Sequence, residues 1–403
     1  MKLKKQKVFE LLCAEHGMII FILAILLFHG LNNYIILTKS RYCFWPDTIT
    51  YFERTEQVFQ ILKNVRIDLK SIYAMYYQIF NYSFRPPLIF ITASPFLLFG
   101  MDRNIVTMSN LIYFAILLFA TYGIGRKLYN YKVGAFSAFL LSMFPTVFSF
   151  SRIFGIDFGL AAMVTLTFYL FTLDKFSSPW FSLLTGVVIG LGSLSKESYF
   201  VFILPILFYF FFQKGGLKDK KVALNFVFLI ITGLLIATAY YLRFSYIQQH
   251  FYHIFQCKTH ISPYFYLRSI LDRQLMPVFS LLLLLSLIRC FTKKEYWFLL
   301  MVLVPLVLFS LSPNKQDRFI LPIFPYFAII IAKFILSIPK HRRIITISLV
   351  LFSCLQYFII SYGSSIPFLR YYTHNFPSAF RKEEISDVGL SSIINDEDYI
   401  NSS

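Results

Sequence analysis

Apolar stretches long enough to cross a lipid bilayer recur along almost the whole chain, and this feature restricts the fold more than any other. A spanning helix needs about 20 mostly apolar residues to cross roughly 30 Å of hydrocarbon. Of the 403 residues, 57% are hydrophobic and only 14% are charged, which is too little polar surface for a soluble protein of this length. We therefore expect an all-α polytopic membrane protein rather than two or three soluble domains.

Basic residues set the expected topology, because short cytoplasmic loops collect lysine and arginine. A lysine-rich segment, residues 2–7, precedes the first apolar run, so we expect the N-terminus in the cytoplasm. An even number of crossings must then separate the later basic clusters at 126–132, 175, 214–221, 293–294 and 340–343. About eleven spanning helices meet this condition, near 17–37, 104–125, 133–150, 158–173, 179–194, 199–213, 222–243, 275–291, 297–311, 319–338 and 344–361.

One further apolar stretch, residues 86–100, would invert every later loop if it crossed the membrane. It is short and contains a third proline, Pro95, so we expect a juxtamembrane or re-entrant helix on the outer side. The transmembrane domain then covers 1–361, with two outer loops and an outer polar tail, at 38–103, 244–274 and 362–403. Cys43 and Cys257 both lie outside in this topology; a disulfide between them is possible in principle, but separate apolar packing is favoured.

The formal net charge of +18 raises the question of a nucleic-acid partner. The basic residues are dispersed between apolar runs rather than clustered in one module, so we exclude nucleic acid. Part of the charge belongs to cytoplasmic loops, and the remainder lies in outer loops, where a phosphate-bearing substrate among the membrane lipids would use it.

Carboxylates at a membrane boundary are costly, about 2.5–3.5 kcal/mol at mid-depth, so acids there are candidates for function. Asp47 follows the first span in FWPDTITYFERTEQ, and Tyr51 would share its helical face four residues later. Asp157 ends the short turn SRIFGID, which also contains Arg152. Two acids on one cavity can hold a divalent cation or share proton transfer. The alternatives are a helix cap for Asp47 and an ion pair between Asp157 and Arg152.

Candidate cations occupy three other outer positions. Arg85 precedes two prolines at an expected helix start, where free N–H groups favour an anion such as phosphate; the alternative is an interfacial arginine that reaches toward lipid headgroups. Lys315 and Arg318, in SPNKQDRFILP, could clamp a lipid phosphate or simply make the loop basic. Lys196 and Glu197, in the SKES turn, form a weaker candidate of the same kind.

Histidine is concentrated in one outer loop. Three of the seven histidines in the chain, His250, His253 and His260, lie between residues 246 and 273. A metal-binding or acid–base role is open to each of them, but a solvated loop tolerates histidine at no cost.

The order of these motifs is more specific than any one of them. A first-loop Asp with Tyr four residues later, a basic residue before Pro-Pro-Leu, a short Ser-Arg…Asp turn, the stretch GLGSLSK and a late Arg-Phe-Ile-Leu-Pro occur in this order between about residues 15 and 340. This order resembles the GT-C glycosyltransferases, within them the branch of lipid A aminoarabinose transferases and protein O-mannosyltransferases. The resemblance implies a GT-C-like catalytic domain at 1–361 in the inner (plasma) membrane, with its active site and C-terminal tail outside.

The same resemblance assigns roles to individual residues. It implies that Asp47 is the catalytic carboxylate and that the donor and acceptor are bound by Tyr51, Arg85, Arg152, Asp157, His260, Lys315 and Arg318. It further implies that Asp157 with a loop histidine such as His260 can bind a divalent metal. Phe84 stands where some relatives have a glutamate, and a phenylalanine cannot ligate a metal.

The implied reaction moves a sugar from a polyprenyl-phosphate donor to a hydroxyl group of a lipid, a glycan or a protein, with inversion at the anomeric carbon. One alternative is a transporter or flippase of lipid-linked sugars, which would need charged residues or inverted repeats within the spans. Another is an O-antigen polymerase or ligase, which would carry its essential arginines in one long late loop. Here the ionisable residues lie at helix ends and in loops, which favours an enzyme that acts from one side.

Overall fold

A computed structural model describes residues 2–39, 46–81, 83, 85–242, 262–292 and 296–363, and within these ranges it contains helices and turns but no strand. The all-α fold predicted from the sequence is confirmed for this part of the chain. Cys43, Phe84, Cys257, His260 and the predicted tail beyond residue 363 lie outside the described residues, as do the other two histidines of the second outer loop.

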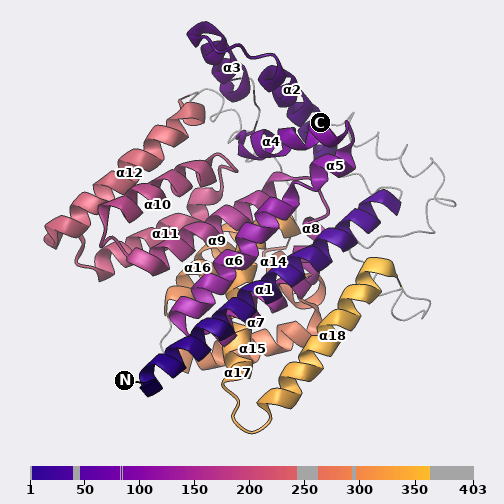
Figure 1. The fold of residues 1–403 in the computed structure, drawn as a ribbon, viewed down its shortest axis with the longest axis vertical. Helices are drawn as coiled ribbons and strands as arrows, with labels where there is room; N and C mark the ends of the chain where they lie inside the picture. Colours follow the sequence, from indigo (N-terminus) through magenta and orange to yellow (C-terminus); the bar gives the residue numbers. More distant parts are fainter. Residues whose placement is uncertain are drawn as a thin grey trace.

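A helix or a pair of helices stands at every predicted spanning range (Figure 1). These are α1 (Lys2–Lys39), α6 (Asn110–Leu128), α7 (Tyr131–Met143) with α8 (Pro145–Phe150), α9 (Ile156–Asp174), α10 (Pro179–Ser193), α11 (Tyr199–Gln213), α12 (Lys220–Tyr241), α15 (Met276–Thr292), α16 (Tyr296–Leu311), η4 (Asp317–Ile323) with α17 (Phe324–Leu336), and α18 (Arg342–Tyr362). Six of the apolar helices in the described residues are long enough to cross a membrane, and the others have 10 to 17 residues. The total of eleven crossings therefore stays a prediction.

The predicted span at 133–150 is interrupted near its middle. Phe144 adopts an extended conformation with ψ of 129°, and α8 begins at the next residue, Pro145. The proline ring disfavours a helical conformation in the residue before it, which separates α7 from α8. The break brings the short turn with Asp157 to the end of the helical bundle.

The smaller helices include the predicted juxtamembrane segment. They are α2 (Pro46–Lys63), α3 (Leu69–Asn81), α4 (Leu88–Ala93), η1 (Ser94–Phe99), α5 (Arg103–Thr107), η2 (Gly216–Lys218), α14 (Phe265–Ser269) and the π-helical η3 (Ile270–Gln274). The apolar stretch at 86–100 is divided between α4 and η1, with Pro95 in the first turn of η1. Together these two helices are too short to cross roughly 30 Å of hydrocarbon.

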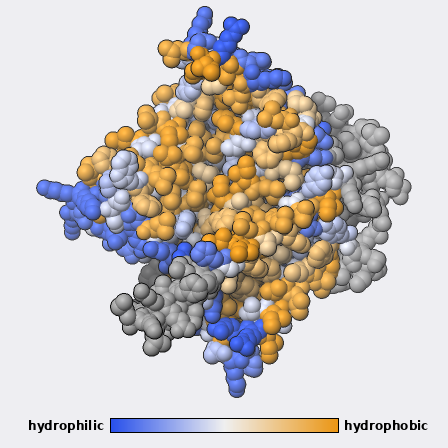
Figure 2. Space-filling model, in the orientation of Figure 1, coloured by the Kyte–Doolittle hydropathy of each residue, from blue (hydrophilic) through white to orange (hydrophobic). Residues whose placement is uncertain are grey.

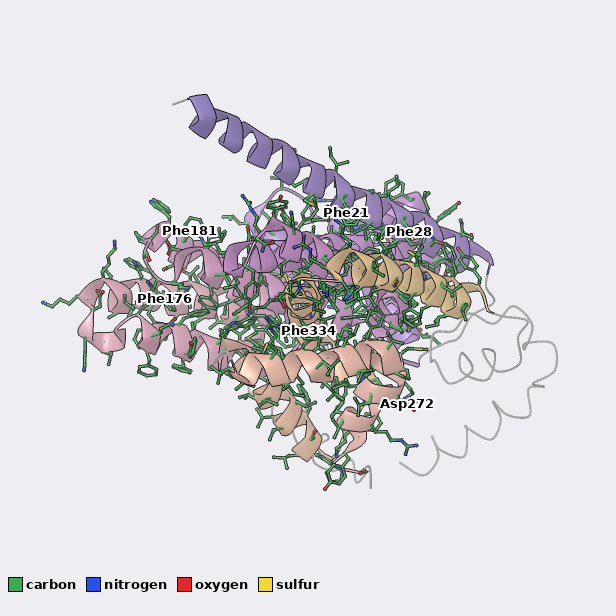
Figure 3. The ribbon with its side chains drawn as sticks, turned by 90° about the horizontal axis from the view of Figure 1, so that it is seen from below. Phe21, Phe28, Phe176, Phe181, Asp272 and Phe334 are labelled. Atoms are coloured by element: carbon green, nitrogen blue, oxygen red, sulfur yellow. The ribbon has the colours of Figure 1, made fainter. Side chains whose placement is uncertain are left out.

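The interior of the molecule is built around α9 and α17, whose side chains are mostly buried. Close helix contacts bring further elements to this interior. A Cβ atom on Gly186 of α10 would lie 2.6 Å from the backbone oxygen of Leu229 in α12, so only glycine permits this approach. In a second view, α1 lies along one edge of the bundle, and Phe21 and Phe28 mark where it covers the interior (Figure 3).

The two ends of the bundle differ in composition. The N-terminus of α1 and the α11–α12 and α17–α18 turns, which contain the basic residues 214–221 and 340–343, lie toward one end. The small helices α2, α3 and α4 lie toward the opposite end (Figure 1). Apolar residues dominate the face between them, and hydrophilic residues gather at its edges (Figure 2). This distribution fits a bundle surrounded by lipid, with polar groups at both ends.

Candidate active site

Five segments that are far apart in the sequence enclose one cavity of about 380 Å³ at the end of the bundle that carries α2. They are the start of α2, the segment before α4, the start of α9, the turn between α10 and α11, and the segment from α16 into η4. Six charged side chains line the cavity: Asp47, Arg85, Asp157, Lys196, Glu197 and Arg318. Three acids and three bases therefore share one small volume.

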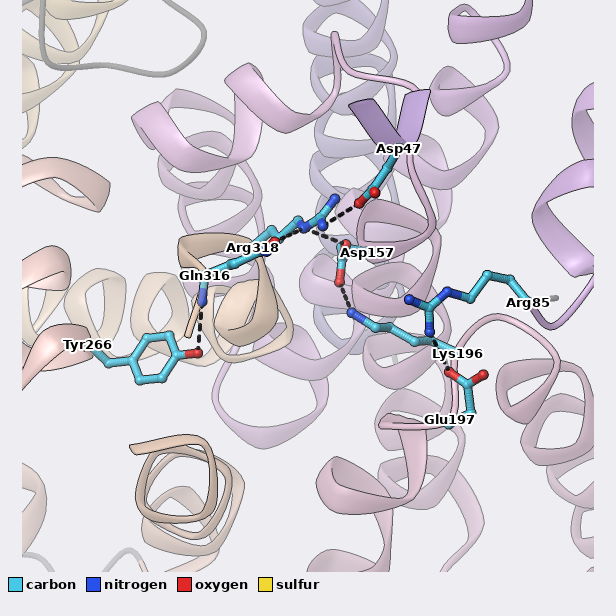
Figure 4. A network of polar contacts seen from close by, with 8 residues as sticks. All are labelled: Asp47, Arg85, Asp157, Lys196, Glu197, Tyr266, Gln316 and Arg318. Carbon is cyan, nitrogen blue, oxygen red and sulfur yellow. Dashed lines mark hydrogen bonds and ion pairs between the residues drawn. The ribbon is translucent and has the colours of Figure 1, made fainter. Parts of the chain in front are cut away.

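Arg318 connects the two acids that the sequence predicted to face one cavity (Figure 4). Its Nη2 donates a hydrogen bond of 2.5 Å to Oδ2 of Asp47, and its Nε lies 3.4 Å from Oδ2 of Asp157. Nε also donates to the side-chain oxygen of Gln316, which fixes the plane of the guanidinium. Because a guanidinium presents its donors in a rigid fork, one arginine can hold two carboxylates at a set spacing.

Asp157 is held by a second cation. Its Oδ1 accepts a hydrogen bond of 2.5 Å from Nζ of Lys196, and its side chain is 4% exposed. The same ammonium lies 4.2 Å from the ring centroid of Phe319, which adds a cation–π contact. A buried carboxylate needs partners of opposite charge. Each oxygen of Asp157 has one, because Oδ1 faces Lys196 and Oδ2 faces Arg318.

Arg85 reaches the cavity from the segment before α4. Its Nη1 lies 3.9 Å from Oε2 of Glu197, in the turn that also carries Lys196. The backbone N–H of Leu88 donates to the carbonyl of Leu194, so the start of α4 and this turn are joined through the main chain as well. This junction places a third cation on the wall of the cavity.

Tyr51 lines the cavity one helical turn after Asp47, as the sequence predicted. The residue is only 3% exposed, and its ring packs against Phe90 with the centroids 5.7 Å apart. Burial raises the pKa of the Tyr51 hydroxyl above its ordinary value, and Asp47 and Asp157 act in the same direction. The hydroxyl therefore stays protonated at neutral pH.

The turn that precedes α9 is fixed from two sides. The amide of Asn110 in α6 donates to the carbonyls of Ser151 and Ile153. The hydroxyl of Thr48 donates to the carbonyl of Phe154 at 3.3 Å. Because Thr48 follows Asp47, this bond ties the helix start that carries one acid to the turn that carries the other.

The start of η4 is fixed to the last part of the predicted second outer loop, where α14 and η3 lie. Asp317 accepts a hydrogen bond from the hydroxyl of Ser269 and lies 3.4 Å from a nitrogen of Arg273. The backbone N–H of Gln316 donates to the hydroxyl of Tyr266 at 3.3 Å. These contacts anchor the two residues that precede Arg318, so Asp317, Tyr266 and Ser269 are positioning residues.

Two predicted site residues, Arg152 and Lys315, do not line this cavity. Arg152 is buried elsewhere: Nε donates to Asn33 of α1, and Nη2 to Tyr357 and Ser361 of α18. It is not among the residues that line the cavity, so its contacts in the structure do not support the predicted substrate-binding role. Lys315 donates to the carbonyl of Ser312, 2.7 Å away, and also does not line the cavity. His260 lies outside the described residues.

Two comparisons with known sequences bear on this site. Residues 85–242 match the family model described as dolichyl-phosphate-mannose-protein mannosyltransferase. An uncharacterized protein of Aquifex aeolicus is 29% identical to the chain over 265 residues, which are 62% of this chain and 60% of that protein. The chain thus spans about 60% of the length of this curated relative.

Solved structures extend the likeness to almost the whole chain. ArnT from Cupriavidus metallidurans, bound to undecaprenyl phosphate, matches 89% of this chain and 69% of its own, with a TM-score of 0.63 and 14% identity. The chain has the GT-C fold. The archaeal oligosaccharyltransferase AglB from Archaeoglobus fulgidus, in complex with an inhibitory peptide and a dolichol-phosphate, matches 89% of this chain and 56% of its own, with a TM-score of 0.54 and 12% identity.

A divalent metal does not fit the described residues of this GT-C cavity well. One structure of the Archaeoglobus fulgidus enzyme contains zinc, but no group of three potential ligands occurs among the described residues here. Both oxygens of Asp157, the predicted metal ligand, already face the cations Lys196 and Arg318. A metal ion at Asp157 would have to displace one of them. The predicted pairing with His260 involves a residue outside the described part of the chain.

Lys196 and Glu197 contribute more to the cavity than the sequence indicated. Their turn was a weak candidate because an adjacent basic and acidic residue is common in a solvated loop. The stretch GLGSLSK was the feature that pointed to Lys196, and the structure places this lysine against Asp157. Nothing in the sequence indicated a role for Gln316, because that role depends only on its contact with Arg318 in the folded chain.

Proposed function

We propose that this chain is a glycosyltransferase that moves a sugar from a polyprenyl-phosphate donor to a hydroxyl acceptor at the outer face of the plasma membrane. The observation that carries the proposal is one cavity that is lined by the accessible Asp47 and by the cations Arg85, Lys196 and Arg318. A carboxylate can serve as general base, and clustered cations can stabilise a departing phosphate. Bound undecaprenyl phosphate and dolichol-phosphate in two proteins of the same fold support a lipid phosphate as the leaving group.

In the proposed reaction, Asp47 accepts the proton of the acceptor hydroxyl, and the hydroxyl oxygen forms a bond to the anomeric carbon of the sugar. The bond between that carbon and the phosphate oxygen breaks, and its electron pair leaves with the polyprenyl phosphate. A single displacement of this kind inverts the anomeric configuration. The side chain of Asp47 is 43% exposed, so an acceptor can reach it, whereas Asp157 is buried and holds cations.

Two lysines, Lys315 and Lys196, receive roles that differ from the sequence-based expectation. Lys315 was expected to clamp the donor phosphate together with Arg318. Lys315 instead bonds to a carbonyl of its own turn, while Lys196 lines the cavity. We therefore assign the phosphate to Arg85, Lys196 and Arg318, and no step of the proposed reaction uses a metal.

The first test is mass spectrometry of glycolipids and glycoproteins from cells with and without the gene. We expect one glycosylated lipid, glycan or protein to disappear with the gene, its unglycosylated form to accumulate, and the wild-type gene to restore it. Incubation of the purified chain with lipid-linked sugar from the same cells should reproduce the product in vitro. Movement of lipid-linked sugar across vesicle membranes without any transfer would instead favour a flippase and contradict the proposal.

The pH dependence of donor binding tests the role of Lys196. Burial lowers the pKa of this amine from its ordinary value, and the charge of Asp157 opposes the shift only in part. Only the protonated amine attracts phosphate, so binding of undecaprenyl phosphate should weaken as Lys196 loses its proton at high pH. Because the pKa of Lys196 is lowered, this loss of binding should occur at a pH below about 10.4, the ordinary pKa of lysine. The variant Lys196→Arg keeps its charge and should lose this alkaline decline. An unchanged decline in that variant would assign the titration to another group.

A further inference from the structure

A second hollow lies outside the candidate active site, between α2 and α3. It is an open groove of about 840 Å³ lined mainly by Glu53, Glu56, Gln57, Gln60 and Gln78. A smaller hollow of about 320 Å³ shares Gln60 and Gln78 with it and continues along the same two helices. Hydrophilic and apolar residues are both visible at this end of the molecule, at the top of Figure 2. The reaction proposed above uses none of these side chains.

The groove follows one face of α2. Glu53, Glu56, Gln57 and Gln60 recur at the spacing of residues on a single helical face, and Asn64 extends the row in the smaller hollow. At 1.5 Å per residue, the row from Glu53 to Asn64 is about 16 Å long. A site of this length fits an extended chain better than a single small molecule.

A buried arginine holds the groove in shape. Arg54 lines it, is only 6% exposed, and joins the two helices: Nη1 donates to the side chain of Gln57, and Nη2 donates to the carbonyls of Gln78 and Ile79. Within the described residues, its Nε is also buried and has no hydrogen-bond partner. Because Arg54 fixes α2 to α3, the groove exists before any ligand binds.

The chemistry of the lining selects among possible ligands. Carboxamides donate and accept hydrogen bonds, and carboxylates accept them, so together they match the many hydroxyl groups of a sugar chain. Two glutamates repel a phosphate or another anion, so the groove is unsuited to the donor lipid. A peptide is usually recognised through apolar pockets or a free strand edge. Ile61 is the one aliphatic side chain in the lining of the larger hollow. Apolar side chains, among them Val65 and Met75, gather in the smaller hollow instead, so the larger hollow is the part of the groove suited to a sugar chain.

We infer that this groove binds an uncharged, hydroxyl-rich glycan chain, which is the acceptor of the transfer reaction; the second part of this inference rests on the proposed function. The groove and the candidate base share α2. By the helix rise, Glu53 lies about 9 Å and Gln60 about 20 Å along the axis from Asp47. The groove faces α3 while Tyr51 packs toward α4, so the glycan lies beside the cavity. Its terminal sugar passes the first turn of α2 to reach Asp47.

The test uses the full chain in lipid nanodiscs, applied to an array of neutral oligosaccharides, anionic oligosaccharides and basic peptides. Wild-type protein should bind a set of neutral oligosaccharides. The double variant Gln60→Leu/Gln78→Leu changes two exposed side chains that line both hollows, and it should weaken that binding at least tenfold. The matched control Gln213→Leu, at the exposed end of α11, should bind like the wild type. Undecaprenyl phosphate binding, measured on each variant, reports that the protein remains folded.

Each outcome separates the groove from the transfer reaction. Absence of neutral oligosaccharide binding, binding unaffected by the double variant, or a preference for basic peptides would overturn the inference. Asp47→Asn should leave glycan binding unchanged, because Asp47 does not line the groove. If transfer fails to appear in any assay while the glycan still binds, the proposed function is lost and the glycan site remains. If transfer occurs and glycan binding does not, only the groove assignment is lost.

Discussion

Replacing Asp47 by asparagine is expected to slow sugar transfer by about 10²–10⁴-fold, which is the usual contribution of a general base. Asparagine keeps the size and one acceptor oxygen of the aspartate, so the hydrogen bond from Arg318 can still form. It cannot accept the proton of the acceptor hydroxyl. The measurement is the rate of product formation by the purified variant, with the product defined by comparing cells with and without the gene.

Two further measurements distinguish a loss of catalysis in Asp47→Asn from a loss of folding or of donor binding. Asp47 is 43% exposed, and exposed ion pairs contribute roughly 0–1 kcal/mol, so thermal unfolding should change little. Undecaprenyl phosphate binding should persist, since the cations around the cavity remain. Asp272→Asn serves as the matched control, because this carboxylate is exposed on η3, away from the cavity lining (Figure 3). Turnover within a few-fold of the wild type in Asp47→Asn would rule out the base assignment.

The fold was largely predictable from the sequence because membrane helices leave a strong local pattern. Each long apolar run coincides with a helix, and the stretch 86–100, expected as a juxtamembrane or re-entrant helix, forms the two short helices α4 and η1, while its position on the outer side stays a prediction. The break at Phe144 was missed, although Pro145 carried the relevant indication. Apolar periodicity across 133–150 concealed it, because an interior proline can also sit in a kinked helix.

The site was predictable only in part, because sequence order does not say which loops meet. Asp47, Tyr51, Arg85, Asp157 and Arg318 do share one cavity. Arg152 lies five positions before Asp157, which suggested an ion pair or a shared ligand. The start of α9 at Ile156 separates them, and the Arg152 guanidinium is directed toward α1 and α18.

The groove on α2 was also beyond the sequence. A row of Glu and Gln at helical spacing is typical of any solvated helix face. Only the position of α3 and the contacts of Arg54 reveal that the row lines a hollow.

Replacing Arg318 by glutamine should damage both stability and turnover. Its side chain is 12% exposed, and it faces Asp47 and the buried Asp157. Removing one partner of a buried ion pair costs up to about 3–5 kcal/mol. Lys196 still faces Asp157, so we expect the lower part of this range as a fall in thermal stability. The loss of a charge that faces the leaving phosphate should also reduce turnover by about 10²–10³-fold.

A second substitution separates the two effects of Arg318→Gln. Asp157→Asn also removes the carboxylate partner of Lys196, so the cost of Arg318→Gln is compared with and without that change. In the Asp157→Asn background the buried acid is already neutral, and adding Arg318→Gln should lower stability less than it does in the wild type. Turnover should stay low in the double variant, because the cation that faces the phosphate is still missing. Arg318→Lys restores a charge without the fork that spans both acids, so it should recover stability better than rate. If Arg318→Gln lowered stability as much in the Asp157→Asn background as in the wild type, the burial of Asp157 would not explain the loss, and the linkage between the two acids through Arg318 would have to be abandoned.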